Sequence, residues 1–108
     1  MLTHRVRSLA ILAIAFALAA WQALGSDPAI SGGSGSSHET AIVVHVSSAA
    51  DGVRAQDTYL RAHYPGYRFI RRAFAFYQGK SYEIITFIDA HGKKHSLYFD
   101  ISEYFKPK

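Results

Sequence analysis

The chain has 108 residues, of which 49 % are hydrophobic and 19 % are charged, and its formal net charge at pH 7 is +4. An apolar N-terminal segment and a small-residue segment after it leave only about 70 residues to build a core, which is close to the lower limit for independent folding. This size excludes a multidomain protein, a large cofactor-binding fold and a multi-pass membrane protein.

Residues 1–25 have the pattern of a secretory signal peptide. Arg5 and Arg7 precede an apolar run that ends in small residues, so that we expect cleavage after Gly25 or, alternatively, after Ala19. The apolar run is shorter than the roughly 20 residues that span a bilayer. We therefore expect a periplasmic or secreted protein with no stable membrane anchor after cleavage. Loss of the two arginines lowers the formal net charge to +2, too little to indicate a polyanionic partner.

Residues 26–40 consist mainly of glycine, serine and other small or polar residues, and we expect them to form a flexible linker. The folded domain is then expected at 41–108. The chain has no cysteine, so this domain must be stabilised by packing, without disulfides.

The first predicted elements of this domain are a strand and a helix. A β-branched run predicts a strand at 41–46. A helix is expected to begin after Ser48, with Val53 and Leu60 on its apolar face, and to end before Pro65-Gly66.

The remaining chain predicts an antiparallel meander of strands at 67–77, 81–88 and 94–101, with turns at Gly79-Lys80 and at 89–93. The fold class is therefore α+β, with one main helix packed on a three- to four-stranded antiparallel β-meander. Side chains alternate between the two faces of each strand. The predicted register places six apolar residues on the face that the helix covers: Phe74, Phe76, Ile85, Phe87, Leu97 and Phe99.

The opposite face of the predicted sheet is unusual for a solvated surface, because it combines tyrosines and isoleucines with a few charges. Tyrosine is enriched at interfaces because it offers a large contact area with a polar tip. We expect this tyrosine-bearing face to bind a partner through six residues: Arg71, Tyr77, Tyr82, Ile84, Lys94 and Tyr98. The alternative is that the face is covered by residues 26–40, by the first strand or by a second copy.

Three stretches resemble the PepSY-like domains of exported bacterial proteins. They are Tyr64-Pro65-Gly66 at the end of the helix, Gly79-Lys80-Ser81-Tyr82-Glu83-Ile84 at the start of a strand, and Gly92 followed by Leu97-Tyr98-Phe99-Asp100. The resemblance covers residues 53–101. It implies a helix on an antiparallel sheet in the periplasm or cell envelope, in a family whose members bind and restrain other proteins, peptidases among them. Related sheets inhibit β-lactamases through an aromatic-bearing face. The resemblance supplies no catalytic residue.

Residue patterns for chemistry are weak. His91 and His95 are four residues apart, but they flank a predicted turn, and no third protein ligand is evident for zinc. We therefore predict no metal and no cofactor. Ser96 and His95 alternate to opposite faces of a strand and cannot form a nucleophile–base pair, so we predict that the protein is not an enzyme.

Nucleic-acid binding is not expected, because strand alternation separates Arg71 from Arg72 and leaves no single basic stripe. The sequence thus predicts an exported binding module for a protein or peptide partner. Two alternatives remain open. One is an envelope protein that binds a metal ion or, through Arg68, Arg71 and Lys94, an anionic polymer or lipid head group. The other is a structural homodimer.

Overall fold

The structure is a computed structural model that describes residues 27–106. The predicted signal peptide and both of its candidate cleavage sites lie outside the described residues. The described elements follow each other as β1 (Ile30–Gly32), β2 (Ile42–Val44), α2 (Ala49–His63), β3 (Arg68–Tyr77), β4 (Lys80–Ile88) and β5 (Lys94–Asp100). Among these residues, no helix has both the length and the apolar character needed to cross a membrane.

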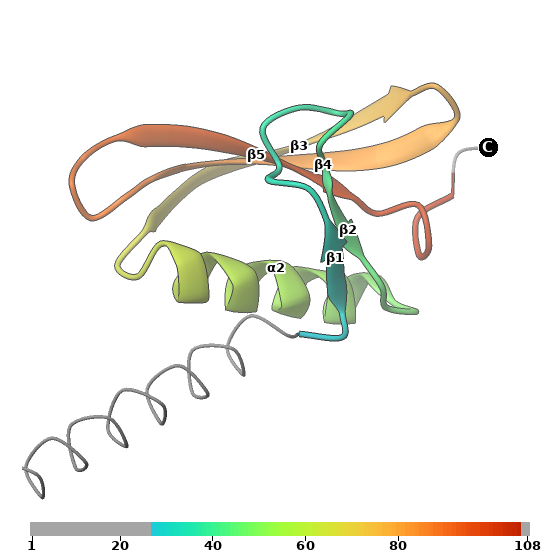
Figure 1. Ribbon diagram of the computed structural model, residues 1–108, viewed down its shortest axis with the longest axis horizontal. Helices are drawn as coiled ribbons and strands as arrows, with labels where there is room; N and C mark the ends of the chain where they lie inside the picture. The colour runs from blue at the N-terminus through green and yellow to red at the C-terminus, as the bar shows by residue number, and fades with distance from the viewer. Residues whose placement is uncertain (1–26, 107–108) are drawn as a thin grey trace, which may run out of the picture.

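The strands form one five-stranded mixed sheet with the order β1-β2-β5-β4-β3. The predicted α+β class and the β3-β4-β5 meander are confirmed, but the sheet is larger than expected and not wholly antiparallel. β2 pairs in parallel with β5, with Ile42 opposite Phe99, and β1 pairs antiparallel with β2. A parallel pair needs a long connection, which α2 and the β3–β4 hairpin provide. Figure 1 shows α2 lying along one face of this twisted sheet.

The region that we expected to be a flexible linker is structured from Asp27 onward. Ile30–Gly32 form β1, and beyond it the backbone N–H of Gly33 donates to the Ala41 carbonyl at 3.1 Å. Gly35 has a φ of +85°, which is the left-handed region where glycine is favoured. The glycines that suggested flexibility therefore form a defined loop, because they allow the tight backbone path between β1 and β2.

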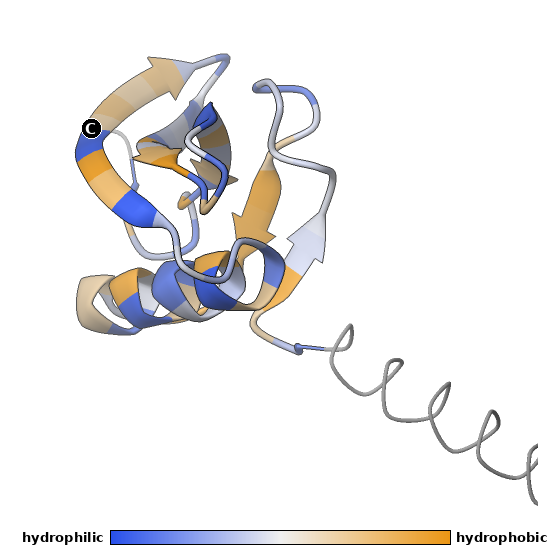
Figure 2. Cartoon of the chain, turned by 90° about the vertical axis from the view of Figure 1, so that its left-hand side faces the viewer, coloured by the Kyte–Doolittle hydropathy of each residue, from blue (hydrophilic) through white to orange (hydrophobic). Residues whose placement is uncertain are grey.

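Helix α2 begins as predicted. The Ser48 side chain accepts a hydrogen bond from the Asp51 backbone N–H at 3.2 Å, which satisfies one of the free donors at the helix start. At the other end the Tyr64 N–H donates to the Leu60 carbonyl before Pro65 stops the helix. Figure 2 shows mixed polar and apolar residues along α2, whereas strands carry longer apolar stretches.

The β3–β4 turn lies one residue earlier in the chain than predicted, which shifts the pairing of the two strands by two residues. Gln78 and Gly79 are its central residues, with φ values of +50° and +77°, as a type I′ turn requires. Tyr77 therefore lies opposite Lys80, not Tyr82. Because a shift of two residues preserves the faces of a strand, the predicted division of side chains between the two faces still holds. The predicted β4–β5 register, with Ile85 opposite Leu97, is confirmed.

The core lies between α2 and the β2, β5 and β4 strands. Its buried members include Ile42, Leu60, Ile85, Phe87 and Phe99. No residue of β3 belongs to this buried cluster within the described chain. Three predicted core residues are instead exposed: Val53, Phe74 and Phe76. The physical reason is geometric, since one helix is too narrow to cover a five-stranded sheet and β3 is the strand left at its edge.

Candidate interaction surface

The six predicted partner-binding residues lie on the sheet face opposite α2, but they do not form one exposed cluster. Ile84 lies opposite Tyr98 and next to Ala73, and Tyr82 lies opposite Ala75 and Asp100. Lys94 pairs with Ile88 at the far end of the sheet from Tyr77. The structure therefore brings Tyr77, Tyr82, Ile84 and Tyr98 together near one end and leaves Lys94 apart.

The loop of residues 33–40 covers the tyrosine-bearing face. The His38 ring lies 4.5 Å from the ring of Tyr77, 4.7 Å from that of Tyr82 and 4.8 Å from that of Tyr98, measured between centroids. The Tyr98 N–H donates to the Gly35 carbonyl at 2.7 Å. Tyr82 is consequently only 5 % exposed, and this burial raises the pKa of its hydroxyl. Of the alternatives raised from the sequence, cover by residues 26–40 is the one that the structure shows.

Most of the exposed large apolar side chains among residues 27–106 lie on the other side of the sheet, near its β3 edge. We call this surface the β3 aromatic patch and define it as Val53, Phe69, Phe74, Phe76 and Phe105. Phe74 and Phe76 are 57 % and 60 % exposed. The Phe105 ring stacks against both, at centroid distances of 5.4 and 6.2 Å. Clustered apolar exposure of this kind marks interaction sites in soluble proteins.

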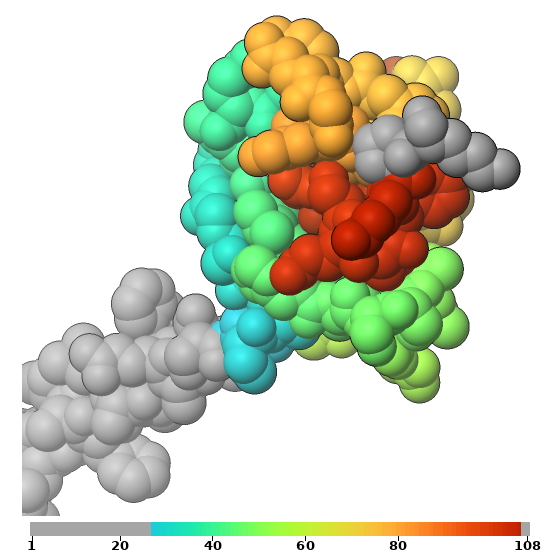
Figure 3. Space-filling view, turned by 90° about the vertical axis from the view of Figure 1, so that its right-hand side faces the viewer, coloured from blue at the N-terminus to red at the C-terminus, as the bar shows by residue number. Residues whose placement is uncertain are grey.

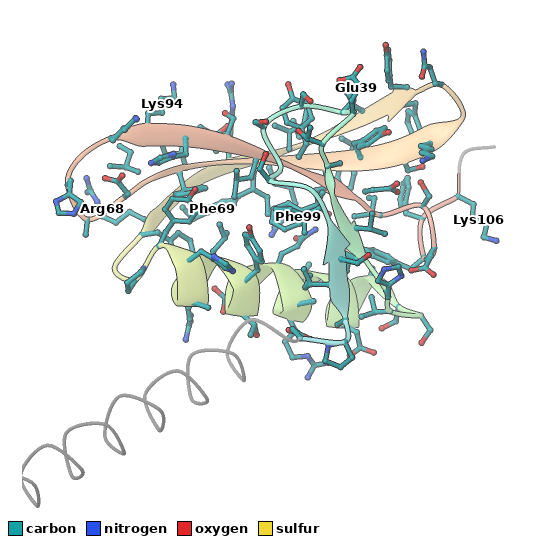
Figure 4. The ribbon with its side chains drawn as sticks, in the orientation of Figure 1. Glu39, Arg68, Phe69, Lys94, Phe99 and Lys106 are labelled. Atoms are coloured by element: carbon teal, nitrogen blue, oxygen red, sulfur yellow. The ribbon has the colours of Figure 1, made fainter. Side chains whose placement is uncertain are left out.

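A groove of about 580 Å³ continues the β3 aromatic patch between α2 and β3. Val53 and Leu60 of α2 form one wall, Phe69 and Arg72 of β3 form the other, and Ile85 lies among the lining residues. The Arg72 guanidinium carbon lies 5.3 Å from the centroid of the Phe69 ring. Figure 4 shows Phe69 and Phe99 pointing into the layer between the sheet and α2.

Beneath this groove lies a buried polar network. Glu83 is 3 % exposed and pairs with the Arg72 guanidinium. Gln56, which is fully buried, donates from Nε2 to Glu83 at 3.0 Å and to the Tyr104 hydroxyl at 3.5 Å. Burial is the main cause that raises the pKa of Tyr104. Every member therefore has a partner, and the network fixes the orientation of Arg72 beside the patch.

The C-terminal turn adds Phe105 to the patch because Tyr104 anchors it on α2. Figure 3 shows this segment between the β3–β4 hairpin and the first turns of α2. The Ile101 N–H donates to the Ser81 carbonyl at 2.9 Å, and the Phe105 N–H donates to the Ile101 carbonyl at 2.9 Å. The first of these hydrogen bonds holds the C-terminal segment against β4, and the second closes the turn around Tyr104.

Of the two histidines considered for a metal site, His95 has a protein partner for its ring, and His91 is held through its backbone N–H. His95 Nε2 lies 2.8 Å from an Asp89 carboxylate oxygen, and the other Asp89 oxygen accepts the His91 backbone N–H at 2.9 Å. No group of three or more candidate metal ligands occurs among residues 27–106.

The sequence patterns did not predict the exposure of Phe74 and Phe76, and we assigned both residues to the core. The two phenylalanines alternate with alanines, so that strand geometry places both on one face, but no local signal states which strand is at the edge of the sheet. Comparisons of the chain with protein-family models, with curated proteins and with solved structures found no match.

Proposed function

We propose that this protein is an exported, non-enzymatic module that binds or restrains a protein or peptide partner through the β3 aromatic patch. The observation that carries the proposal is the exposure of Phe74 and Phe76 on a strand that has no neighbour on its outer side within the described chain. The resemblance to PepSY-like domains and the signal-peptide pattern support a binding role in the cell envelope.

The proposal moves the docking surface from the tyrosine-bearing face to the opposite side of the sheet. Tyr82 is buried under the loop of residues 33–40, so its role is to pack against that loop. Arg71 and Tyr77 point to the tyrosine-bearing side and are not part of the β3 aromatic patch, but both are exposed on the same edge strand and lie next to it.

Site-specific photo-crosslinking tests this proposal. A photoreactive side chain at position 76 should capture one defined polypeptide in the native host, whereas the same group at the exposed Thr58 of α2 should not. The captured polypeptide is then purified and its affinity is measured by calorimetry. We expect the double substitution Phe74→Ser/Phe76→Ser to weaken binding by about tenfold or more, as for central apolar contacts in other interfaces. Equal capture at both positions, or unchanged affinity of the double variant, would exclude the patch as the docking surface.

A second candidate function is binding of an anionic polymer or lipid head group at the far end of the sheet. Arg68, Ile88 and Lys94 lie opposite one another on adjacent strands, and Figure 4 shows the two basic residues near the same end. Binding to anionic vesicles should then fall with ionic strength and should be lost in Arg68→Glu/Lys94→Glu. Vesicle binding that changes neither with ionic strength nor in the Arg68→Glu/Lys94→Glu variant would rule this candidate out.

A further inference from the structure

We propose that the partner segment is an extended peptide that adds to the sheet as a further strand along β3, with large apolar residues alternating with acidic ones. This inference rests on the proposed function, because it names the chemistry of the partner that would dock at the same edge.

The backbone of β3 is available for such pairing. β3 is the last strand in the sheet order, so one row of its N–H and C=O groups faces outward with no strand opposite it among residues 27–106. An edge of this kind is a template for strand addition. A register shift between Phe69 and Arg71 interrupts the strand, after which pairing is regular up to Tyr77. The usable edge is therefore Arg71–Tyr77, which is about 23 Å long at the usual rise per residue.

The side chains of β3 set the pattern that the added strand must match. Phe74 and Phe76 point to the α2 side of the sheet, where they are exposed, and Arg71 and Tyr77 point to the opposite side. Alternate residues of a neighbouring strand face the same two sides. Every second side chain of the added peptide would be apolar and would cover Phe74 and Phe76. The side chains between them would point to the opposite side of the sheet and lie beside Arg71.

Charge favours an acidic peptide over a second copy of the chain. β3 carries three arginines and no acidic residue. Arg72 is paired with Glu83, but neither Arg68 nor Arg71 forms an ion pair within the described part of the chain. The β3 edge of a second copy would offer the same three arginines and no acidic residue to pair with Arg71. Bulges and edge charges are features that oppose such self-association. An acidic residue beside Arg71 supplies the missing counter-charge.

The first test uses a fluorescently labelled octapeptide that alternates glutamate and valine, with binding to the purified protein measured by anisotropy. Two further versions carry N-methyl groups, one on the odd-numbered and one on the even-numbered amides. In an added strand only one set of amides faces β3. We expect one methylated version to lose binding and the other to retain it. A peptide of the same composition in block order should bind more weakly.

A charge test identifies the side of β3 that the peptide contacts. Arg71→Glu should weaken binding of the alternating peptide by about tenfold or more. Lys93→Glu, which changes the net charge equally in the β4–β5 turn, should have a much smaller effect.

The outcomes separate this inference from the proposed function. Equal binding of both methylated peptides would overturn strand addition, while crosslinking at position 76 would still support docking at the patch. Binding of the crosslinked partner without any binding of the alternating peptide at millimolar concentration would overturn the acidic-strand chemistry alone. A third outcome is that the protein dimerises as its concentration rises, that the peptide does not compete with this dimerisation, and that Arg71→Glu strengthens it. A second copy of the chain would then occupy the β3 edge, and the inference would be overturned.

Discussion

At the scale of single residues, the contact between Gly52 and Tyr104 joins the start of α2 to the C-terminal turn. A Cβ atom added at Gly52 would overlap the ring and hydroxyl of Tyr104. Glycine in a helix normally lowers the stability of that helix relative to alanine. The structure explains its presence, because only a residue without a side chain lets Tyr104 approach Gln56.

Gly52→Ala should therefore destabilise the protein, although alanine is normally the better helix former. We expect the free energy of unfolding in urea to fall by about 1–3 kcal/mol, the usual cost of overpacking a filled site. In the background of Tyr104→Ala the same substitution should be neutral or stabilising. A loss of equal size in both backgrounds would show that the overlap with Tyr104 is not its cause.

At the scale of elements, the β4–β5 turn is held by one carboxylate. Asp89 accepts backbone N–H groups from His91 and Lys93, each at 2.9 Å, and it pairs with the His95 ring at 2.8 Å. The hydrogen bond to His95 is the largest cause that lowers the pKa of Asp89 from 3.8 to about 2. Gly92, with a φ of +83°, completes the turn.

This lowered pKa gives the turn a defined pH dependence. Because the pKa of Asp89 is lower in the folded state than in the unfolded chain, its ionised form stabilises the fold above about pH 4, and that contribution is lost as the pH falls toward 2. Asp89→Asn should lower the Tm at pH 6, and the difference from the wild type should narrow between pH 4 and pH 2 in thermal melts. A difference that is the same at pH 6 and at pH 2 would mean that the charge of Asp89 is irrelevant.

At the scale of the whole molecule, the two faces of the sheet are covered by different means and to different extents. α2 covers the β2, β5 and β4 side of one face, and the loop of residues 33–40 covers the tyrosines on the other. Neither reaches Phe74 and Phe76. The fold is thus closed at one side of the sheet and open at β3, which is where we place the partner.

This asymmetry predicts contrasting effects of two phenylalanine substitutions on stability. Phe87 is fully buried, so Phe87→Ala should lower the free energy of unfolding by about 3–5 kcal/mol. Phe76→Ala should cost less than about 1 kcal/mol, since it removes mainly an exposed ring that stacks on Phe105. Urea denaturation of both variants checks this. A large loss in Phe76→Ala would place that ring in the core and remove the basis for a free patch.

Local patterns in the sequence predicted the α+β class, the extent of the helix after Ser48 and the β4–β5 register, because capping, apolar spacing and turn chemistry act between residues close in the chain. The tertiary structure decided three further features: the parallel pairing of β2 with β5, the path of the glycine-rich loop over Tyr82, and the edge position of β3. Each depends on which distant segments meet, and alternation along a strand shows its two faces but not its neighbours. The same phenylalanines would be core residues in a central strand, and they form a surface here because the fold leaves β3 at the edge.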